Sequence, residues 1–418
     1  MHPFTLAFLA ALAAATVARL WLAGRHVRHI AAKRGVVPSA FAGRITLTAH
    51  QTAADYTSAR TRLGMIDTVL AALVLLAFTL GGGLQAVSGA WDGVFEPGGY
   101  AHGIALGVSV AVIGAALELP LDLYRTFVIE ERFGFNRTTA ALYLTDLLKQ
   151  AAIGTLLGVP LFFCVLWLME RMGDAWWLYV WLTWIAFNLL VVSIYPTLIA
   201  PMFNRFTPLE DAPLRERIER LLARCGFRAQ GLFIMDSSRR SSHGNAYFTG
   251  FGAAKRIVLF DTLIARLAPP EIEAVLAHEL GHFSRRHVWK RMALMFLASL
   301  GFLWVLGHLI GQDWFYAGLN VRSHSTAMAL ILFFMVAPVF AFLLQPLASL
   351  YARRHEYEAD AYAADHAAAS DLVQALVKLY QDNASTLTPD PLHSAFYDSH
   401  PPAALRIARL QAASHSPA

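Results

Sequence analysis

TAMALILFFMVAPVFAFLLQPLASLYARRHEYEAD, residues 326–360, decides how this chain folds. Its first part, residues 326–350, contains no charged side chain and exceeds the length of about 20 apolar residues that a helix needs to cross a membrane. Its last part, residues 351–360, is dense in charged side chains. The stretch therefore predicts a membrane span that carries several carboxylates at its polar end.

Six other apolar runs of similar length precede this one, at about residues 3–23, 65–90, 101–121, 150–169, 175–200 and 291–311. Only 15% of the 418 residues are charged, against roughly 25% in soluble domains. The first run has its basic residues downstream, which is the reverse of a secretory signal, so we interpret it as a span. The sequence thus predicts an all-α, multi-pass membrane protein with seven transmembrane helices.

The loop charges predict the orientation of these spans. Segments 24–64 and 122–149 are rich in Lys and Arg, whereas the alternate loops hold only Arg171 and Arg322. By the positive-inside rule the N-terminus is outside and the C-terminus is cytosolic. The net charge of +5 is modest and lies in these loops, which indicates membrane topology and no nucleic-acid partner. Two large polar regions then face the cytosol, at 201–290 and 351–418.

Two acidic residues, Glu118 and Asp122, flank Pro120 at the inner end of the third span. An ionisable group at that depth usually faces protein or water instead of lipid. The pair therefore marks either a helix end at the interface or a wet internal cavity, and the residues leave both interpretations open.

The first polar region contains His278-Glu279-Leu280-Gly281-His282. On a helix, these two imidazoles lie on one face, one turn apart, which suits one Zn²⁺, and Glu279 lies beside the open position of the metal. On its own the pattern also fits two surface histidines, so a third ligand is required. Gly281 costs helix stability, which indicates that another backbone approaches closely, with substrate as one candidate.

The bounds of this helix can also be predicted. Pro269-Pro270-Glu271 is typical of a helix start, with Pro in the first turn and acidic residues at the positive end of the dipole. We expect the helix to continue through His282 as far as the Arg285-Arg286-His287 cluster. Leu276, Leu280 and Phe283 should then pack against the core.

Candidates for the third ligand follow the last span. Glu356 and Asp360 are four residues apart and share a helical face, whereas Glu358 points away from it. We assign Glu356 to zinc and expect Asp360 to hold the non-ligating nitrogen of a zinc histidine. The alternative for Glu356 is a surface ion pair with Arg353 or Arg354.

The spans and the two polar regions divide the chain into four expected parts. Spans six and seven form a hairpin that returns the chain to the side it left, so both groups of ligands can meet. The parts are residues 1–200 with five spans and their cytosolic loops, 201–290 with the cytosolic metalloprotease region and its small β element, 291–350 with two spans, and 351–418 with the third ligand and C-terminal helices.

Together these residues resemble the CAAX prenyl protease type 1 family, integral-membrane zinc peptidases of the HExxH…E type that cleave isoprenylated proteins. The resemblance extends over about residues 119–410 and includes several separate motifs in the same order. They are LP (119–120), TFVIEE (126–131), GFN (134–136), IAP (199–201), FTPL (206–209), RSSH (240–243), NAYF (245–248), GF (250–251), KRIVLFDTL (255–263) and SHPP (399–402) with Arg406.

The resemblance implies that seven helices enclose an intramembrane chamber with the zinc site on its cytosolic roof. It also implies that Asn245, Ala246, Tyr247 and Phe248 lie on or beside an edge strand that pairs with extended substrate. Ordinary strand core is the alternative for Tyr247 and Phe248. The implied substrate ends in Cys-aliphatic-aliphatic-any, is prenylated on the Cys and loses its last three residues.

The expected chemistry is metal-assisted peptide hydrolysis. One Zn²⁺ per chain on His278, His282 and Glu356 would lower the pKa of its water toward 7. Glu279 would accept the proton and deliver it to the leaving amine. His400 and Arg406 are the candidates for stabilising the oxyanion, with a rigid turn and a surface residue as their alternatives.

Two other functions remain open at this point. A general quality-control endopeptidase for membrane proteins would cleave without a prenyl preference. A non-catalytic receptor or transporter would carry no zinc. The expected partners are a protein or peptide substrate, prenylated in the first interpretation, and membrane lipid. The C-terminus shows no dilysine signal, so we expect a bacterial-type inner membrane first and the endoplasmic reticulum second.

Overall fold

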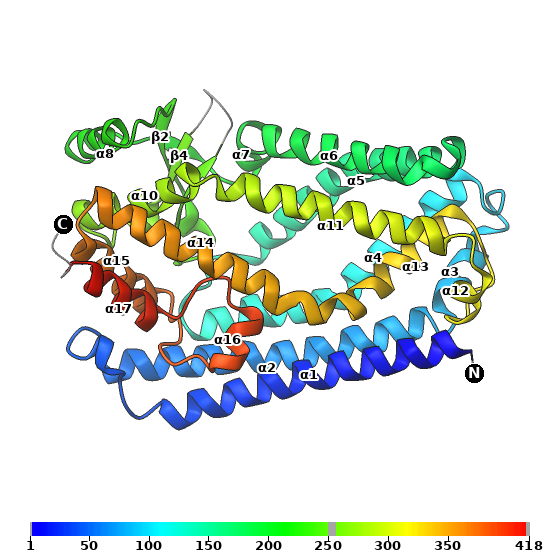
Figure 1. Cartoon of the computed structure of the whole chain (residues 1–418), viewed down its shortest axis with the longest axis horizontal. Coiled ribbons are helices and arrows are strands. Elements are labelled where there is room, and N and C mark those ends of the chain that lie inside the picture. The colour runs from blue at the N-terminus through cyan, green and yellow to red at the C-terminus, as the bar shows by residue number, and fades with distance from the viewer. Residues whose placement is uncertain (1, 250–255, 415–418) are drawn as a thin grey trace.

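The structure, a computed structural model, describes residues 2–249 and 256–414. Among these residues, seven helices are long and apolar enough to cross a membrane, which confirms the predicted fold class. Figure 1 shows them running along the long axis of the molecule, with the two termini at opposite ends. They are built on α1 (Pro3–Lys33), α2 (Leu47–Phe78), α4 (Tyr100–Tyr124), α5 (Ala140–Arg171), α6 (Trp176–Ile194), α11 (His287–Leu309) and α13 (Thr326–Ala341). The third, fifth and seventh spans extend into adjoining helical segments, as far as Glu130, Phe203 and His366.

The remaining elements connect the spans or gather at the end of the molecule where the C-terminus lies (Figure 1). The α-helices among them are α3 (Gly83–Trp91), α7 (Ala200–Phe203), α8 (Ala212–Arg224), α9 (Asp261–Ile264), α10 (Pro269–Ser284), α12 (Asp313–Ala317), α14 (Gln345–His366), α15 (Ala369–Asp382), α16 (Pro391–Tyr397) and α17 (Ala403–Ser414). The 3-10 helices and π-helices are η1 (Ser39–Phe41), η2 (Arg125–Glu130), η3 (Gly173–Ala175), η4 (Tyr195–Ile199), η5 (Ser237–Arg239) and η7 (Phe342–Leu344).

The second span differs from its predicted bounds of 65–90. The apolar run contains a chain reversal at Gly81-Gly82-Gly83, where Gly82 has a φ of +76°. A Cβ on Gly81 would lie 2.7 Å from the carbonyl oxygen of Ala77, so the turn requires glycine there. The helix therefore ends at Phe78. It begins at Leu47, well before the predicted start at residue 65, and so includes a more polar segment that precedes the apolar run.

The predicted β element is a four-stranded sheet in the order β1-β2-β4-β3. Strands β2 and β4 are parallel and the other pairs are antiparallel, so β3 is an edge strand that pairs with β4. The strands are β1 (Phe206–Pro208), β2 (Gly231–Met235), β3 (Ala246–Thr249) and β4 (Arg256–Phe260). Three motif residues, Gly250, Phe251 and Lys255, lie outside the described residues.

Helix α10 lies between the sheet and the C-terminal helices, and its apolar face builds one of the hydrophobic cores. Leu276 and Leu280 are buried in that core beside Ile257 of the sheet, as their helical spacing predicts. Phe283 packs edge-on against Phe227, with the ring centroids 5.2 Å apart. This packing fixes the opposite face of α10, which carries the two histidines.

The predicted end of α10 at the Arg285-Arg286-His287 cluster is confirmed to within one residue. The helix ends at Ser284, and Arg286 adopts the left-handed conformation with a φ of +57°. Helix α11 then begins at His287. The chain thus turns sharply after the HExxH motif, which brings His287 back toward the helix it has just left.

The two acidic residues near Pro120 have different surroundings. Glu118 lines a cavity of about 290 Å³ between α1, α2, α4 and α13, together with Arg19 and Asp67. Asp122 accepts a hydrogen bond from the hydroxyl of Tyr143 at 2.6 Å. The structure therefore favours the internal-cavity interpretation for Glu118.

Candidate active site

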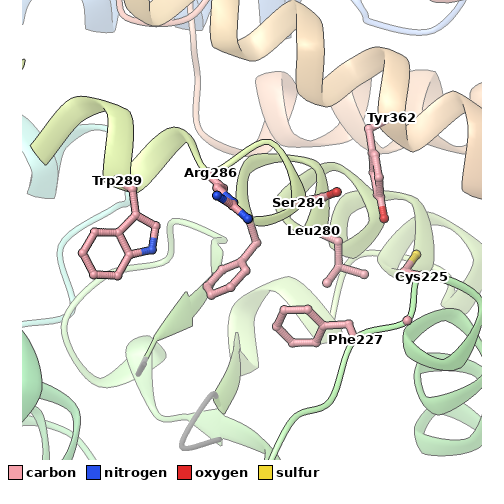
Figure 2. Close-up of a pocket in the computed structure, with 9 residues that line it drawn as sticks. Cys225, Phe227, Leu280, Ser284, Arg286, Trp289 and Tyr362 are labelled. Atoms are coloured by element: carbon pink, nitrogen blue, oxygen red, sulfur yellow. The ribbon is translucent and has the colours of Figure 1, made fainter. Parts of the chain in front are cut away.

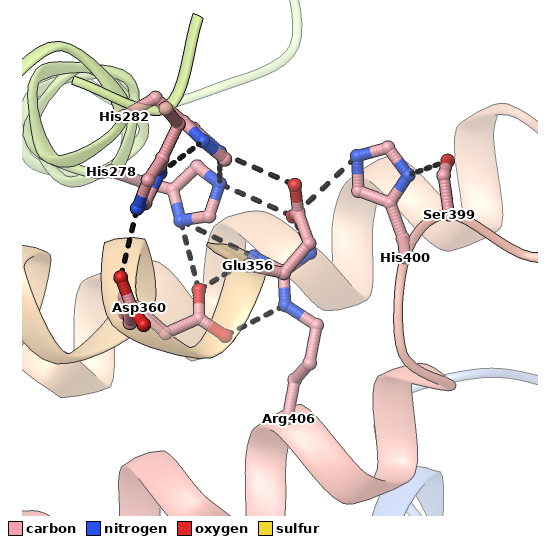
Figure 3. A network of polar contacts seen from close by, with 9 residues as sticks. His278, His282, Glu356, Asp360, Ser399, His400 and Arg406 are labelled. Carbon is pink, nitrogen blue, oxygen red and sulfur yellow. Dashed lines mark hydrogen bonds and ion pairs between the residues drawn. The ribbon is translucent and has the colours of Figure 1, made fainter. Parts of the chain in front are cut away.

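Two histidines of α10 and one glutamate of α14 converge on a single point (Figure 3). The Nε2 atoms of His278 and His282 are 3.2 Å apart. Glu356 places Oε2 3.5 Å from Nε2 of His278 and Oε1 3.2 Å from Nε2 of His282. One ligand atom from each residue lies within 4.8 Å of the others, so the three could hold one metal ion.

The chemistry of these donors fits zinc. Two imidazole nitrogens and one carboxylate oxygen are a ligand set of hydrolytic zinc sites, which keep their fourth position open. Glu356 is buried, and its Oε2 has no hydrogen-bond partner among the described residues. The alternative ion pair with Arg353 or Arg354 is not formed, because Arg353 bonds backbone carbonyls and Arg354 bonds Glu358.

Asp360, one turn after Glu356, supports the first histidine from behind. Its Oδ1 lies 2.9 Å from Nδ1 of His278, the ring nitrogen that faces away from the point of convergence. Burial lowers the pKa of His278, but the hydrogen bonds that the ring donates to Asp360 and Glu356 outweigh it and raise that pKa to about 9. In the absence of metal, the ring is therefore protonated at neutral pH.

Arg406 of α17 forms a fork with the same carboxylate. Its Nη2 and Nε donate to Oδ1 and Oδ2 of Asp360 at 2.6 and 2.8 Å, and both side chains are buried. Its Nη1 lies 3.6 Å from Oε2 of Glu356. Two of its three nitrogens are thus engaged by Asp360, which favours holding that carboxylate over contacting substrate.

His400 faces the point of convergence from the opposite side (Figure 3). Its Nε2 lies 3.5 Å from Oε2 of Glu356, and its Nδ1 is 3.0 Å from the hydroxyl of Ser399. The side chain is 61% exposed, so it is accessible to a ligand. Among the two predicted oxyanion donors, the geometry favours His400.

A cleft of about 470 Å³ opens beside the metal ligands. Glu279 lines it together with His278, His400 and Asn383. Burial raises the pKa of Glu279, because a low-dielectric surrounding disfavours the charged carboxylate. A carboxylate with a raised pKa at the wall of a cleft is suited to accept and return a proton.

The four residues predicted to bind substrate divide into two pairs. Asn245 and Ala246 line the cleft. Tyr247 directs its hydroxyl toward the sulfur of Met235, 3.9 Å away, and Phe248 packs against Phe227. The edge strand therefore borders the cleft at its first residues, and two of the four side chains contribute to packing.

Gly281 allows close helix packing. A Cβ at this position would lie 2.9 Å from Cα of Ala359 and 3.0 Å from Cβ of Tyr362. The backbone that approaches Gly281 thus belongs to α14, and the suggestion that it is substrate is wrong. This contact sets the separation at which Glu356 of α14 meets the histidines of α10.

Figure 2 shows a second cavity, of about 500 Å³, lined by Leu280, Phe283 and Ser284 of α10 together with Cys225 and other residues. None of the three metal ligands lines this cavity. Leu280, although it lies between the two histidines in sequence, points away from them. The cleft beside the three convergent residues is therefore the one that Glu279 and His278 border.

Several contacts around the site were not foreseen from the sequence. His287 and Glu358 form a hydrogen-bonded chain that ends on His282. At the cleft, Oδ1 of Asn383 lies 3.1 Å from Nδ1 of His243 and accepts from the backbone N–H of Gly244. The one signal available was a third histidine shortly after the HExxH motif.

Comparison with known proteins agrees with this architecture. The model of the CAAX prenyl protease N-terminal region, with five membrane helices, matches residues 26–205, and that of peptidase family M48 matches residues 208–414. The CAAX prenyl protease 1 homolog of Arabidopsis thaliana is 37% identical over 310 residues, covering 73% of this chain and 72% of that protein. CAAX prenyl protease 1 of Saccharomyces cerevisiae is 36% identical, covering 71% and 69%.

A solved structure extends the match to the whole chain. The crystal structure of S. mikatae Ste24p superposes with a TM-score of 0.92 at 28% sequence identity, covering 98% of this chain and 99% of that one. The matched M48 region contains all the convergent residues described above. This chain is a membrane metallopeptidase and belongs to the CAAX prenyl protease 1 family.

Proposed function

We propose that the metal is zinc and that the chain removes the C-terminal three residues of proteins prenylated on a CAAX cysteine. The observation that carries this proposal is the convergence of His278, His282 and Glu356 beside Glu279, at a cleft bordered by an edge strand. The names of the relatives, CAAX prenyl proteases, support the substrate class.

His278, His282 and Glu356 would hold the ion, with Asp360 and Arg406 fixing the first ring. A bound zinc ion would supply Lewis-acid polarisation of the scissile carbonyl and a lowered pKa for a water molecule. Glu279 takes a proton from the attacking water and returns it to the leaving amine, a role that suits its raised pKa.

His400 is our proposed oxyanion donor. With the Ser399 hydroxyl donating to Nδ1, the ring proton would lie on Nε2, and that atom faces the metal ligands. A donor placed in this way stabilises the charge that develops on the carbonyl oxygen in the transition state. Arg406 acts one step further away, by holding Asp360.

Substrate would bind as an extended chain along β3, near Asn245 and Ala246. Backbone bonds to an edge strand are independent of sequence, so selectivity must come from pockets and from the lipid. Each buried CH₂ of a prenyl group contributes about 0.8 kcal/mol, which suits an active site built at the end of membrane helices.

The loop charges support a cytosolic catalytic face, because the basic loops and the metal ligands share one side of the membrane under the positive-inside rule. A bacterial-type inner membrane is the first expectation for the membrane itself and the endoplasmic reticulum the second. Membrane fractionation combined with protease accessibility of residues 351–418 tests both the face and the compartment.

The central experiment compares a farnesylated CAAX peptide with its unmodified twin, with and without a chelator. We expect one zinc per chain by elemental analysis, chelator-sensitive cleavage after the prenylated cysteine by mass spectrometry, and slower cleavage of the twin. Glu279→Gln should keep the zinc and lose turnover. The matched control Glu273→Gln, on the same helix but paired with Arg217, should retain both.

Each part of the proposal has an outcome that contradicts it. Equal cleavage of the two peptides would instead support a quality-control endopeptidase without prenyl preference. Purified active protein without zinc would exclude the metal assignment. Ordinary turnover in Glu279→Gln would exclude Glu279 as the general base.

A further inference from the structure

We propose that His287 and Glu358 are positioning residues that fix the ring orientation and the tautomer of His282. The inference depends on the proposed zinc site and goes beyond it, because neither residue is among the three convergent metal ligands. His287 is the first residue of the membrane helix α11, and Glu358 lies on a different face of α14 from Glu356.

The three side chains form a continuous chain of hydrogen bonds. Nδ1 of His282 lies 3.0 Å from Nδ1 of His287, and Nε2 of His287 lies 3.0 Å from Oε2 of Glu358. The side chain of His287 is fully buried, and that of Glu358 is 32% exposed. Both ring nitrogens of His287 are therefore engaged inside the protein.

The chemistry of these groups allows one order of donors and acceptors when His282 holds a metal. Nε2 of His282 faces Glu356 and His278, so a metal ligand at this atom carries no proton and Nδ1 must carry one. That proton is donated to Nδ1 of His287. The remaining proton of His287 then lies on Nε2 and is donated to the carboxylate of Glu358, which only accepts.

The opposite order would block the site. If Nδ1 of His287 were the donor, Nδ1 of His282 would accept and the proton of that ring would occupy Nε2, where the metal binds. A carboxylate at the far end prevents this, because it keeps the proton of His287 on Nε2. Glu358 thus fixes the tautomer of His282 indirectly, through the buried ring of His287.

The local fold explains how His287 reaches this position. The left-handed turn at Arg286 ends α10 and starts α11, so the side chain of His287 folds back onto the last turn of α10. The ring of His355 stacks on the face of the His287 ring, with the two centroids 4.0 Å apart and the planes 9° from parallel. This stacking fixes the plane of the ring and hence the direction of both bonds.

Three carboxylates of α14, within little more than one helical turn, have different partners at the site. Glu356 meets the metal, and Asp360, on the same face, bonds Nδ1 of His278 directly. Glu358 lies between them in sequence and therefore on another side of the helix. It reaches the second histidine only through an intervening group, and His287 is that group.

The test measures zinc affinity of the full chain in detergent, by competition with a chromophoric chelator. Outer hydrogen-bond partners of metal ligands are worth about 10- to 100-fold in metal affinity, so we expect His287→Leu and Glu358→Leu each to weaken zinc binding by about that factor. His287→Gln should recover part of the loss, because its amide can accept from His282 and donate to Glu358. Cobalt-substituted protein should show a changed visible spectrum in both Leu variants.

Controls separate this role from general destabilisation. Glu273→Leu removes a similarly placed carboxylate of α10 that pairs with Arg217 and Arg224, and should leave zinc affinity unchanged. If His287→Leu fails to fold, the partly exposed Glu358→Leu still decides the question. Wild-type zinc affinity and cobalt spectrum in folded Glu358→Leu overturn the inference, whereas absence of zinc from the wild-type chain overturns the proposed function itself.

Discussion

Arg406 and Asp360 form a buried two-point ion pair, with Nη2 to Oδ1 at 2.6 Å and Nε to Oδ2 at 2.8 Å. The pair connects the C-terminal helix α17 to His278, because the same carboxylate bonds Nδ1 of that ring. Removing Arg406 leaves the buried carboxylate with His278 as its remaining partner, so the cost should lie at or below the value of about 3 to 5 kcal/mol for breaking a buried ion pair. We expect Arg406→Ala to lower the unfolding free energy by up to this amount and to weaken zinc binding.

Thermal unfolding and chelator competition on the purified variant measure these two effects. Arg406→Lys should recover little, because an ammonium group cannot reproduce the fork geometry. The exposed Arg409, one turn along the same helix, supplies the control, and Arg409→Ala should change neither quantity by a comparable amount. Unchanged stability of Arg406→Ala would show that water replaces the guanidinium at no cost.

Replacement of Gly281 tests whether the separation of α10 and α14 matters for catalysis. A Cβ there would meet the backbone of Ala359 at 2.9 Å, so Gly281→Ala must push Glu356 away from the two histidines. We expect lower stability and at least a tenfold loss of kcat/KM, since small displacements of catalytic groups can cost about 100-fold.

The matched control for Gly281→Ala is Gly301→Ala on α11, where nothing lies within 4 Å of the added methyl group. Both changes gain about 1 kcal/mol of helix propensity, so their difference reports the steric contact alone. If Gly281→Ala and Gly301→Ala had the same stability and kcat/KM, the close approach of Gly281 to Ala359 would matter for neither stability nor catalysis.

Metal uptake should depend on pH through His278. The pKa of this ring is raised to about 9 in the metal-free protein, so zinc must displace a proton throughout the range below that value. We expect the apparent zinc affinity to rise at least tenfold per pH unit between pH 7 and pH 9, and at least one proton to be released per zinc bound. Chelator competition at several pH values and proton-release calorimetry measure this.

The sign of the effect on the metal-free protein follows from the same pKa. A pKa raised above the unfolded value stabilises the fold fully at low pH, and this contribution is lost as pH rises through about 9. Asp360→Asn removes the largest contact that raises the pKa, so the pH dependence of zinc uptake should shift to lower pH. A wild-type affinity independent of pH between 7 and 9 contradicts the assignment.

The fold and the main ligands could be predicted because each depends on a local pattern. Long uncharged runs require spans, and a spacing of four residues on a helix fixes which side chains share a face. From these two rules we predicted that His278, His282 and Glu356 lie together, and the structure places them within reach of one metal ion. The catalytic and metal-binding roles of these residues stay predictions until the experiments above are done.

What the sequence did not reveal depends on chain reversals and on distant contacts. The left-handed turn at Arg286 has no glycine to signal it, so the fold-back that brings His287 into contact with His282 was not predicted. The fork between Arg406 and Asp360 joins residues far apart in the chain. The second span was misplaced because the hydrophobic run continues across the reversal at Gly82.

The backbone of β3 makes a sharper prediction about how substrate binds. The carbonyl of Asn245 accepts from the N–H of Phe260, so residue 245 faces β4. In an antiparallel pair, successive residues direct their backbone N–H and C=O groups alternately toward the partner strand and away from it. The backbone groups of Ala246 and Phe248 therefore point to the outer edge of the sheet. An extended substrate should place N–H groups opposite these two carbonyls, two residues apart.

Single N-methylation along a peptide substrate tests this register. Loss of one backbone hydrogen bond costs about 1 kcal/mol, so N-methylation at either of the two positions should raise KM about fivefold. N-methylation of the residue between them serves as the control and should have little effect, because its N–H points away from β3. An alternating pattern across three consecutive amides identifies strand pairing, since a steric effect of the methyl group would decline smoothly with distance from the scissile bond. Equal KM values for all three methylated peptides would exclude β3 as the binding edge.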